Sequence, residues 1–396
     1  MLRRLAYAIL AFAASICAVQ AQEENEFARR TSTEFMTSPR VSETEPGGIF
    51  AAAGRFIGLL QLDNVATPAS GAPFSSLYAE SELRGYVSIT QLFTINGLIH
   101  LEQVRDQQAG GAFVDENLYV QRLFAVVNAA PLHVYGGKIH PRFGMGWYAT
   151  PGLYGSDVAE EYELREKLGF GIRADIRTLG RHRLTLETFQ ADTSFLSGSL
   201  IPGPQPGDPQ VKRQARRSLA SGGVSNTGAL DSFAAALSSR RIPGLPGFGT
   251  DIGWAMQKAS PLEVRDEYSW VVGATWQFPL TKTTSLAPLA EFTSVKGQAG
   301  ANRDVDYLTL AANLRIDALW AVAVHTTERF VRDYAAGDYR TDWMAGAGVA
   351  YDLGERFKES IRWLNGFSLL AGFRHDRRLG TDRETIGLQL RYERDL

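Results

Sequence analysis

Residues 138 to 173 carry many side chains that hold a charge or can exchange a proton. The acidic members include Asp157, Glu160, Glu161 and Glu163, and the basic members include Lys138, His140, Arg142 and Arg173. Charges of opposite sign that face each other across a narrow aqueous passage focus the electric field and select among ions. On an exposed loop the same groups would be ordinary solvated residues. Both readings remain open from this segment alone.

Covalent chemistry has little support in the sequence. There is no Gly-x-Ser-x-Gly motif, no phosphate-binding glycine loop and no His-Glu-x-x-His motif. The 6 histidines are scattered, and His100, His325 and His375 are those that folding could place beside an acid, as in a barrel hydrolase. We expect them to be polar residues of a wet interior, with no catalytic residues, no metal site and no cofactor.

The elements that must position these groups show a two-residue period. In residues 307–317, YLTLAANLRID, apolar side chains occupy the even positions from Leu308 to Ile316. Thr309, Asn313 and Arg315 fall on the odd positions. Strict alternation predicts a β-strand with one apolar and one polar face. The apolar face would meet a soluble core or lipid, and the polar face would meet bulk water or a wet lumen.

The same alternation recurs along the chain and predicts about 14 strands, with a range of 12 to 16. The expected spans are 50–63, 76–89, 91–104, 116–129, 131–142, 165–178, 181–195, 266–280, 284–297, 305–317, 319–331, 339–352, 364–376 and 383–392. Most are near the length of about 9 to 11 residues that a tilted transmembrane strand needs. Aromatic residues often end the apolar face, as Trp270 and Phe278 do. Very short connectors alternate with long polar ones, which predicts turns at one end of a barrel and loops at the other.

Bulk composition narrows the class of protein. The 396 residues hold 41 Lys plus Arg and 43 Asp plus Glu, a balance that excludes a strongly basic nucleic-acid-binding protein. The N-terminus, MLRRLAYAILAFAASICAVQAQ, has a basic start, an apolar run and small residues at a cleavage site. It predicts a secretory signal peptide over 1–21 and therefore an exported protein. We expect 22–48 to be a polar, disordered tail. No later run of about 18 apolar residues predicts a transmembrane helix.

The whole pattern resembles Gram-negative outer-membrane porins. The signal peptide, the alternating strands, the aromatic ends, the uneven loops and the ending GLQLRY carry this resemblance over about 50–392. It implies an all-β fold, a closed antiparallel transmembrane barrel over 49–392. It also implies that Tyr392 is the terminal aromatic that the barrel assembly machinery reads, with 393–396 as a tail. The long loop would be 197–265, within which ALDSFAAALSS could form a helical turn or two.

The porin resemblance also gives the charged segment a role. In general porins an inward-folded loop narrows the pore and sets acidic groups against basic groups on the wall. Here that loop would be 143–164, with Asp157, Glu160, Glu161 and Glu163 on the loop. The wall would carry Lys138, His140, Arg142, Arg173 and Arg315.

The function expected from these observations is an outer-membrane channel for passive diffusion of small hydrophilic solutes or ions. Its partners would be outer-membrane lipid, lipopolysaccharide and the assembly machinery, with a homo-oligomer left open and no nucleic acid. The basic run Lys212, Arg213, Arg216 and Arg217 could contact lipopolysaccharide phosphates or be solvated. Three other classes remain: a barrel enzyme acting on lipid or peptide, a non-conducting structural or adhesive barrel, and a secreted soluble β-protein.

Overall fold

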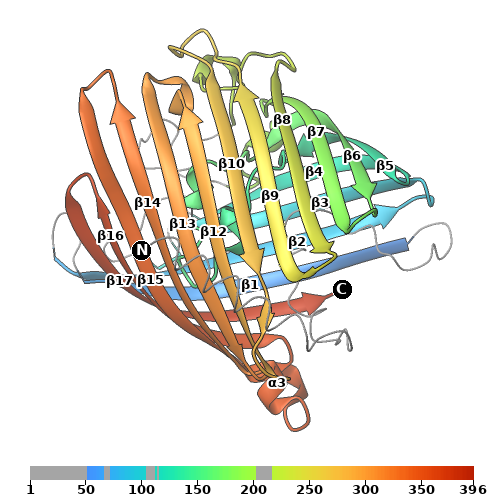
Figure 1. Ribbon diagram of the computed structural model, residues 1–396, viewed down its shortest axis with the longest axis vertical. Coiled ribbons are helices and arrows are strands. Elements are labelled where there is room, and N and C mark those ends of the chain that lie inside the picture. The colour runs from blue at the N-terminus through green and yellow to red at the C-terminus, as the bar shows by residue number, and fades with distance from the viewer. Residues whose placement is uncertain (1–50, 67–71, 104–111, 114–115, 202–215) are drawn as a thin grey trace.

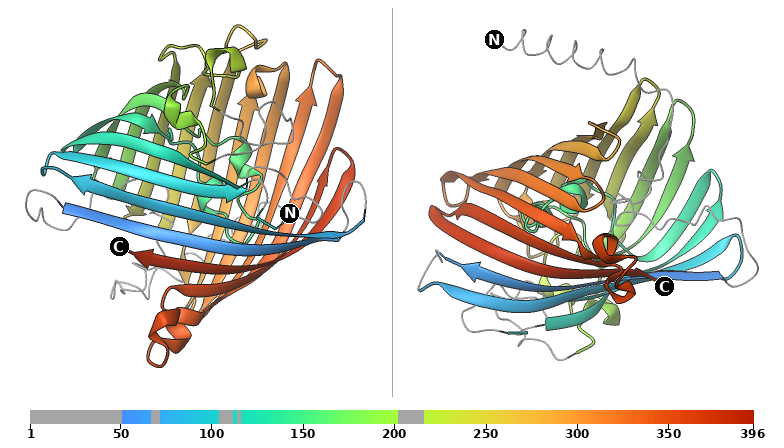
Figure 2. Two further views of the ribbon diagram at one scale, coloured as in Figure 1. Left: turned by 180° about the vertical axis from the view of Figure 1, so that it is seen from behind. Right: turned by 90° about the horizontal axis from the view of Figure 1, so that it is seen from below.

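A single antiparallel sheet closes on itself to form a barrel (Figures 1 and 2). The computed structural model describes residues 51–66, 72–103, 112–113, 116–201 and 216–396. Each long strand pairs with its neighbours in chain order, and the last strand pairs with the first, where Gln389 lies opposite Gln61. The expected signal peptide and tail, as well as Lys212 and Arg213, lie outside the described residues.

Sixteen strands span the barrel, and β11 is a two-residue piece that pairs with β12 beyond the end of β10. The strands are β1 (Ala51–Val65), β2 (Phe74–Ser88), β3 (Phe93–Gln103), β4 (Glu116–Ala129), β5 (Leu132–Ile139), β6 (Lys167–Ile176), β7 (Arg181–Ala191), β8 (Ser232–Ile242), β9 (Leu245–Gln257), β10 (Glu267–Trp276), β11 (Phe278–Pro279), β12 (Thr284–Lys296), β13 (Arg303–Ile316), β14 (Trp320–Asp333), β15 (Asp338–Asp352), β16 (Phe367–Arg378) and β17 (Thr381–Asp395). The short helices are α2 (Gly146–Ala149), α3 (Leu353–Phe357), η3 (Ala159–Glu161), η4 (Phe195–Ser197), η5 (Leu219–Ser221), η6 (Gln298–Gly300) and η7 (Arg362–Leu364). No helix in the described part of the chain is long and apolar enough to cross a membrane.

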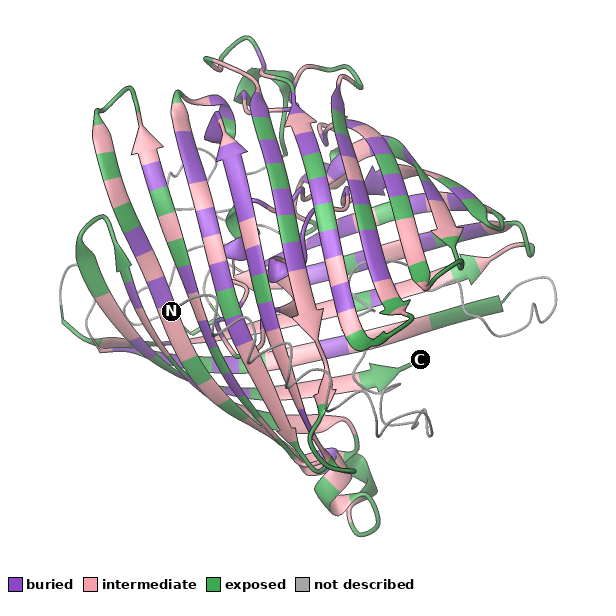
Figure 3. Ribbon diagram, in the orientation of Figure 1, coloured by how far each residue is buried: buried purple, intermediate pink, exposed green. Residues whose placement is uncertain are grey.

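Burial alternates along the strands as the two-residue period predicts (Figure 3). On β13, Tyr307 and Thr309 are buried inside the barrel, whereas Leu310 on the other face is 46% exposed. Large apolar side chains such as Ile172, Val324 and Leu388 are likewise exposed on the outside. Buried polar groups and exposed apolar groups invert the pattern of a water-soluble core, which identifies the outer surface as the lipid-facing one.

The connectors differ between the two ends of the barrel. The start of β1 and the end of β17 lie at the same end of the barrel, which we call the terminus end. The connectors 130–131 and 243–244 at this end are tight turns. At the opposite loop end, 140–166 and 192–231 are the longest connectors. The sorting is not strict, because the terminus end also holds the connector 353–366, and 334–337 at the loop end is short.

Three sequence expectations need correction. The count of 14 strands is too low because the expected loop 197–265 contains the hairpin of β8 and β9. The helical turn expected in ALDSFAAALSS is instead the start of β8, in which Phe233 and Leu237 face outward. The expected tail 393–396 is mostly strand, because β17 continues to Asp395 and pairs with Arg55.

A charge placed on the outer face tests the assignment of faces. Leu310→Arg, at the middle of β13, should lower the free energy of unfolding by about 2–4 kcal/mol, because an arginine in hydrocarbon is poorly solvated. Asn313→Arg on the inward face of the same strand is the control and should cost much less. Urea unfolding in lipid vesicles measures both, and equal losses would contradict the assignment.

Candidate functional site

The connector 140–166 folds into the barrel and lies against the inner wall on the far side from β5 and β6 (Figure 2). Its partners include seven inward-facing residues of six strands. They are Asp63 on β1, Asp251 on β9, Glu291 on β12, Tyr307 on β13, Arg329 on β14, Arg374 on β16 and Arg378, also on β16. We call residues 140–166 the inner loop. The segment 143–164, expected to be an inward-folded constriction loop, lies within it.

Glu291 holds the start of α2 against the wall. Its side chain is 2% exposed and accepts hydrogen bonds from the backbone N–H groups of Met145 and Gly146, the latter at 2.9 Å. It also accepts a 2.6 Å bond from the Tyr162 hydroxyl. A Cβ at Gly146 would lie 2.5 Å from Glu291 Oε1, so this approach requires glycine. One carboxylate thus satisfies two backbone donors and one side-chain donor of the inner loop.

Asp251 and Asp63 hold two further points of the inner loop. Arg142 donates to both Asp251 oxygens at 3.2 Å, and the Tyr148 hydroxyl donates to Asp251 at 2.6 Å. The Tyr154 hydroxyl donates to Asp63 Oδ1 at 2.6 Å. Arg142, which the sequence places in the constriction, therefore acts in the structure as an anchor of the loop.

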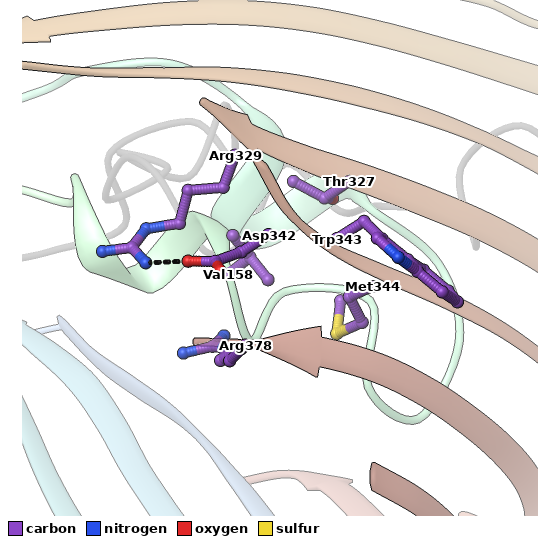
Figure 4. Close-up of a pocket in the computed structure, with 7 residues that line it drawn as sticks. All are labelled: Val158, Thr327, Arg329, Asp342, Trp343, Met344 and Arg378. Carbon is purple, nitrogen blue, oxygen red and sulfur yellow. Dashed lines mark hydrogen bonds and ion pairs between the residues drawn. The ribbon is translucent and has the colours of Figure 1, made fainter. Parts of the chain in front are cut away.

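Arginines of the wall bind the acidic residues of the loop. Arg374 pairs with Asp157 at 2.5 Å, and Glu161 pairs with both Arg329 and Arg378 at 3.0 Å. A small cleft lies here between Val158 of the loop and strands β14 to β16, where Arg329 also binds Asp342 (Figure 4). Beneath these pairs an apolar cluster fills the space between loop and wall. It contains Phe143, Val158, Tyr162, Leu164, Val271, Val295, Val305, Val331 and Met344.

The opposite face of the inner loop turns its charges toward β1 to β4. Glu163 pairs with Arg165 and lies 3.5 Å from His140 Nδ1. Arg165 Nη2 lies 3.1 Å from Glu160, whose side chain is 42% exposed. Burial alone would raise the pKa of Glu163, but Arg165 and His140 offset it and lower the pKa to about 2. Glu163 is therefore a fixed negative charge at all ordinary pH values.

Arginines also line the wall that faces these loop charges. Arg55 lies directly opposite Arg84, Arg84 opposite Leu98, and Leu98 opposite Arg122, so the three arginines share one row across β1 to β4. Arg84 pairs with Glu82, and Arg55 pairs with Glu393. Arg122 makes no hydrogen bond or ion pair with any residue that the structure describes, and the acidic residue with which it interacts electrostatically is Glu163 of the inner loop.

The structure brings some of the predicted site residues together and separates others. His140, Asp157, Glu160, Glu161 and Glu163 lie in the inner loop. Lys138 is 1% exposed and lies 2.7 Å from Glu166 and 2.8 Å from Asp192. Arg173 pairs with Asp175 near the terminus end, and Arg315 lies near the same end of β13.

The sequence prediction missed the arginine row. Arg84 could have been found, because Tyr78, Glu80, Glu82 and Arg84 alternate with apolar or small residues on β2. Arg122 could not, because an irregularity in the pairing of β3 with β4 shifts the alternation there.

Two of the three candidate histidines lie beside acids, His100 beside Glu80 and His375 at 3.5 Å from Glu384. His100 lies 2.9 Å from Glu80 and 3.1 Å from the Tyr119 hydroxyl, His325 faces Gly346, and His375 stacks on Trp343. In the described part of the chain, none of these three bonds to a serine. No group of three or more His, Cys, Asp or Glu residues there could hold a metal ion.

Comparison with known proteins places the fold. OprB of Pseudomonas putida superposes with a TM-score of 0.58 at 11% identity, covering 87% of this chain and 94% of OprB. A loop-deletion mutant of OmpT, an outer membrane protein of Vibrio cholerae, gives 0.53 at 8% identity, covering 88% and 100%. An anion-selective porin from Comamonas acidovorans gives 0.52 at 11% identity, also covering 88% and 100%. The chain has the fold of an outer-membrane porin. No family model and no curated relative matches the sequence.

Removing the Glu291 carboxylate should release the inner loop. Glu291→Ala leaves three donors without their acceptor, so it should lower the free energy of unfolding by at least about 3 kcal/mol, since each buried unsatisfied donor costs about 1–3 kcal/mol. Proteolysis within 140–166 should become faster. Glu328→Ala, at an exposed position on the outer face of β14, is the control. Unchanged proteolysis in Glu291→Ala would show that other contacts fix the loop.

Glu160 should make ion selectivity depend on pH. Its enclosure within the barrel raises its pKa to about 7, with Arg165 opposing the shift and Asp157 and Glu163 adding to it. A raised pKa means that the carboxyl is neutral below about pH 7 and charged above it. Reversal potentials in a salt gradient should therefore move toward cation preference between pH 6 and 8. Glu160→Gln should abolish this step, and its persistence would assign it to another group, such as His100.

Proposed function

We propose that the protein is an outer-membrane channel through which small hydrophilic solutes and ions diffuse passively. One observation carries this proposal. The inner loop is fixed to one side of the lumen, and its charged face, with Glu160, Glu163 and Arg165, is turned toward β1 to β4, where Glu163 interacts electrostatically with Arg122 of the arginine row. The passage would run between these two surfaces. Water and solute would meet opposed charges there, which is the arrangement that focuses an electric field.

The proposal does not include covalent chemistry or a cofactor. Diffusion through a charged passage needs only a lumen, water and fixed charges. The porin fold supports this choice, because one of the compared proteins is an anion-selective porin. The enzyme alternative has His100 beside Glu80 as its best pair, but that pair has no serine partner among the described residues.

We also infer the setting of the channel. The lipid-facing outer surface and the porin fold support a bacterial outer-membrane location, reached through a signal peptide over 1–21. Outer-membrane lipid, lipopolysaccharide and small hydrophilic solutes would be its partners. Tyr392, on the outward face of β17, would be the aromatic that the assembly machinery reads. A homo-oligomer remains an option.

Reversing the charge of Arg122 tests the proposed passage. A unit charge at about 4 Å changes an ion's energy in water by about 1 kcal/mol, which is roughly fivefold in permeability. In planar bilayers, Arg122→Glu should therefore shift the permeability ratio toward cations by at least this factor. Arg377→Glu, on the outer face of β16 and half exposed, is the matched control and should leave the ratio unchanged. A folded barrel that conducts no ions would contradict the proposed function, and so would a permeability ratio that Arg122→Glu leaves unchanged.

A further inference from the structure

The connector 353–366 at the terminus end is longer than a turn between two neighbouring strands needs to be. It joins β15 to the neighbouring strand β16, whereas 130–131 and 243–244 make the same kind of connection at the same end. Figure 1 shows α3 projecting beyond the strand ends. Ordering extra backbone costs roughly 1–2 kcal/mol of conformational entropy per residue, so contacts that compensate for it are expected.

The connector has a defined internal structure. The Asp352 side chain accepts a 2.7 Å hydrogen bond from the Glu355 N–H and so caps α3. The Ile361 N–H donates to the Phe357 carbonyl at 2.8 Å, and the Leu364 N–H donates to the Ile361 carbonyl at 3.1 Å. These bonds fix the position of η7, and with it Trp363.

Trp363 continues a row of aromatic side chains from the lipid-facing surface. Its ring meets Phe367 edge-on at 6.2 Å, Phe367 lies 4.6 Å from Tyr392, and Tyr392 lies 6.3 Å from Phe56. Phe367 shares the outward face of β16 with Leu369 and Phe373. Trp363 itself is 73% exposed. Amphipathic aromatic rings concentrate where the hydrocarbon of a membrane meets its headgroups.

The connector that carries this tryptophan also carries cationic side chains. Arg356, Lys358 and Arg362 are exposed on the connector, and Lys358 is paired with Glu355 at 2.7 Å. Arg362 directly precedes Trp363. A guanidinium group binds phosphate oxygens through two parallel hydrogen bonds, and such a group beside an interfacial ring complements a lipid phosphate.

We propose that residues 353–366 form a membrane anchor that binds the glycerophospholipid headgroups at the terminus end of the barrel. Trp363 inserts at the boundary between headgroups and acyl chains, and Arg362 binds lipid phosphate. The anchor extends the lipid-facing surface formed by Phe56, Tyr392 and Phe367. This role is independent of whether the lumen conducts.

Fluorescence quenching by lipid tests the anchor directly. In a Cys17→Ser background, Trp363→Cys carries a bimane label in vesicles whose acyl chains are brominated near the headgroup. The label should be quenched nearly as strongly as one at Phe367→Cys on the lipid face. A label at Asn313→Cys, on the inward face of β13, should be quenched little. Quenching at 363 as weak as that at 313 would overturn the proposal. If Trp363→Cys does not fold, a label at Leu364→Cys gives the same reading.

The role of Arg362 is tested by lipid charge. The emission of the label at 363 should shift further to the blue in vesicles containing phosphatidylglycerol than in phosphatidylcholine alone. Arg362→Gln should remove that difference and leave single-channel conductance unchanged. A conductance change in Arg362→Gln, with the lipid-dependent shift intact, would assign the connector to the pore mouth and overturn the anchor. A shift abolished by Lys358→Gln but not by Arg362→Gln would also contradict it.

Discussion

A strand that crosses hydrocarbon finds no water for its backbone, and the rest of this structure depends on that constraint. Every spanning strand must pair on both edges, so the sheet can end only by closing, as β17 does on β1. A closed barrel of sixteen strands has a wide interior. In a smaller barrel the inward side chains would fill the interior completely. The outward faces can then be apolar, and the charged residues are collected inside.

The collected charges explain why the inner loop lies where it does. Acids such as Glu291 and Asp251 on the wall would be costly to bury without donors, and the loop supplies backbone N–H groups, tyrosine hydroxyls and Arg142. An apolar cluster between loop and wall then fills one side of the lumen. The remaining side is lined by charges that the wall does not neutralise completely, with Arg122 as the clearest case. Closure of the barrel thus creates the lumen, the lumen accommodates the inner loop, and the loop leaves a charged passage beside it.

The sequence alone predicts the structural features that depend on the alternation of apolar and polar residues. The faces of β13 and the tight turn at 130–131 agree with it. It misses β8 because Ala and Ser give little contrast between faces, and β9 because Pro246 and its glycines suggest a loop. Lys138 lies an even number of residues from the outward-facing Leu132 and Val134, so alternation places it on the outer face of β5. It is buried because Asp192 and the backbone of Leu196, far away in the sequence, bind its ammonium group. Long-range pairs of that kind have no local signature.

The position of the inner loop across the lumen is the central claim, and a disulfide tests it most directly. A Cβ built at Gly152 would lie 3.6 Å from the Cβ of Ala323 on β14, which is within disulfide geometry. Because Gly152 has a φ of 101°, Gly152→Ser alone is the control for the strain that any side chain adds there. In a Cys17→Ser background, Gly152→Cys with Ala323→Cys should form a disulfide in the folded barrel and leave single-channel conductance the same before and after reduction. Failure of the folded double variant to oxidise, or a conductance that changes on reduction, would show that the loop does not rest against β14.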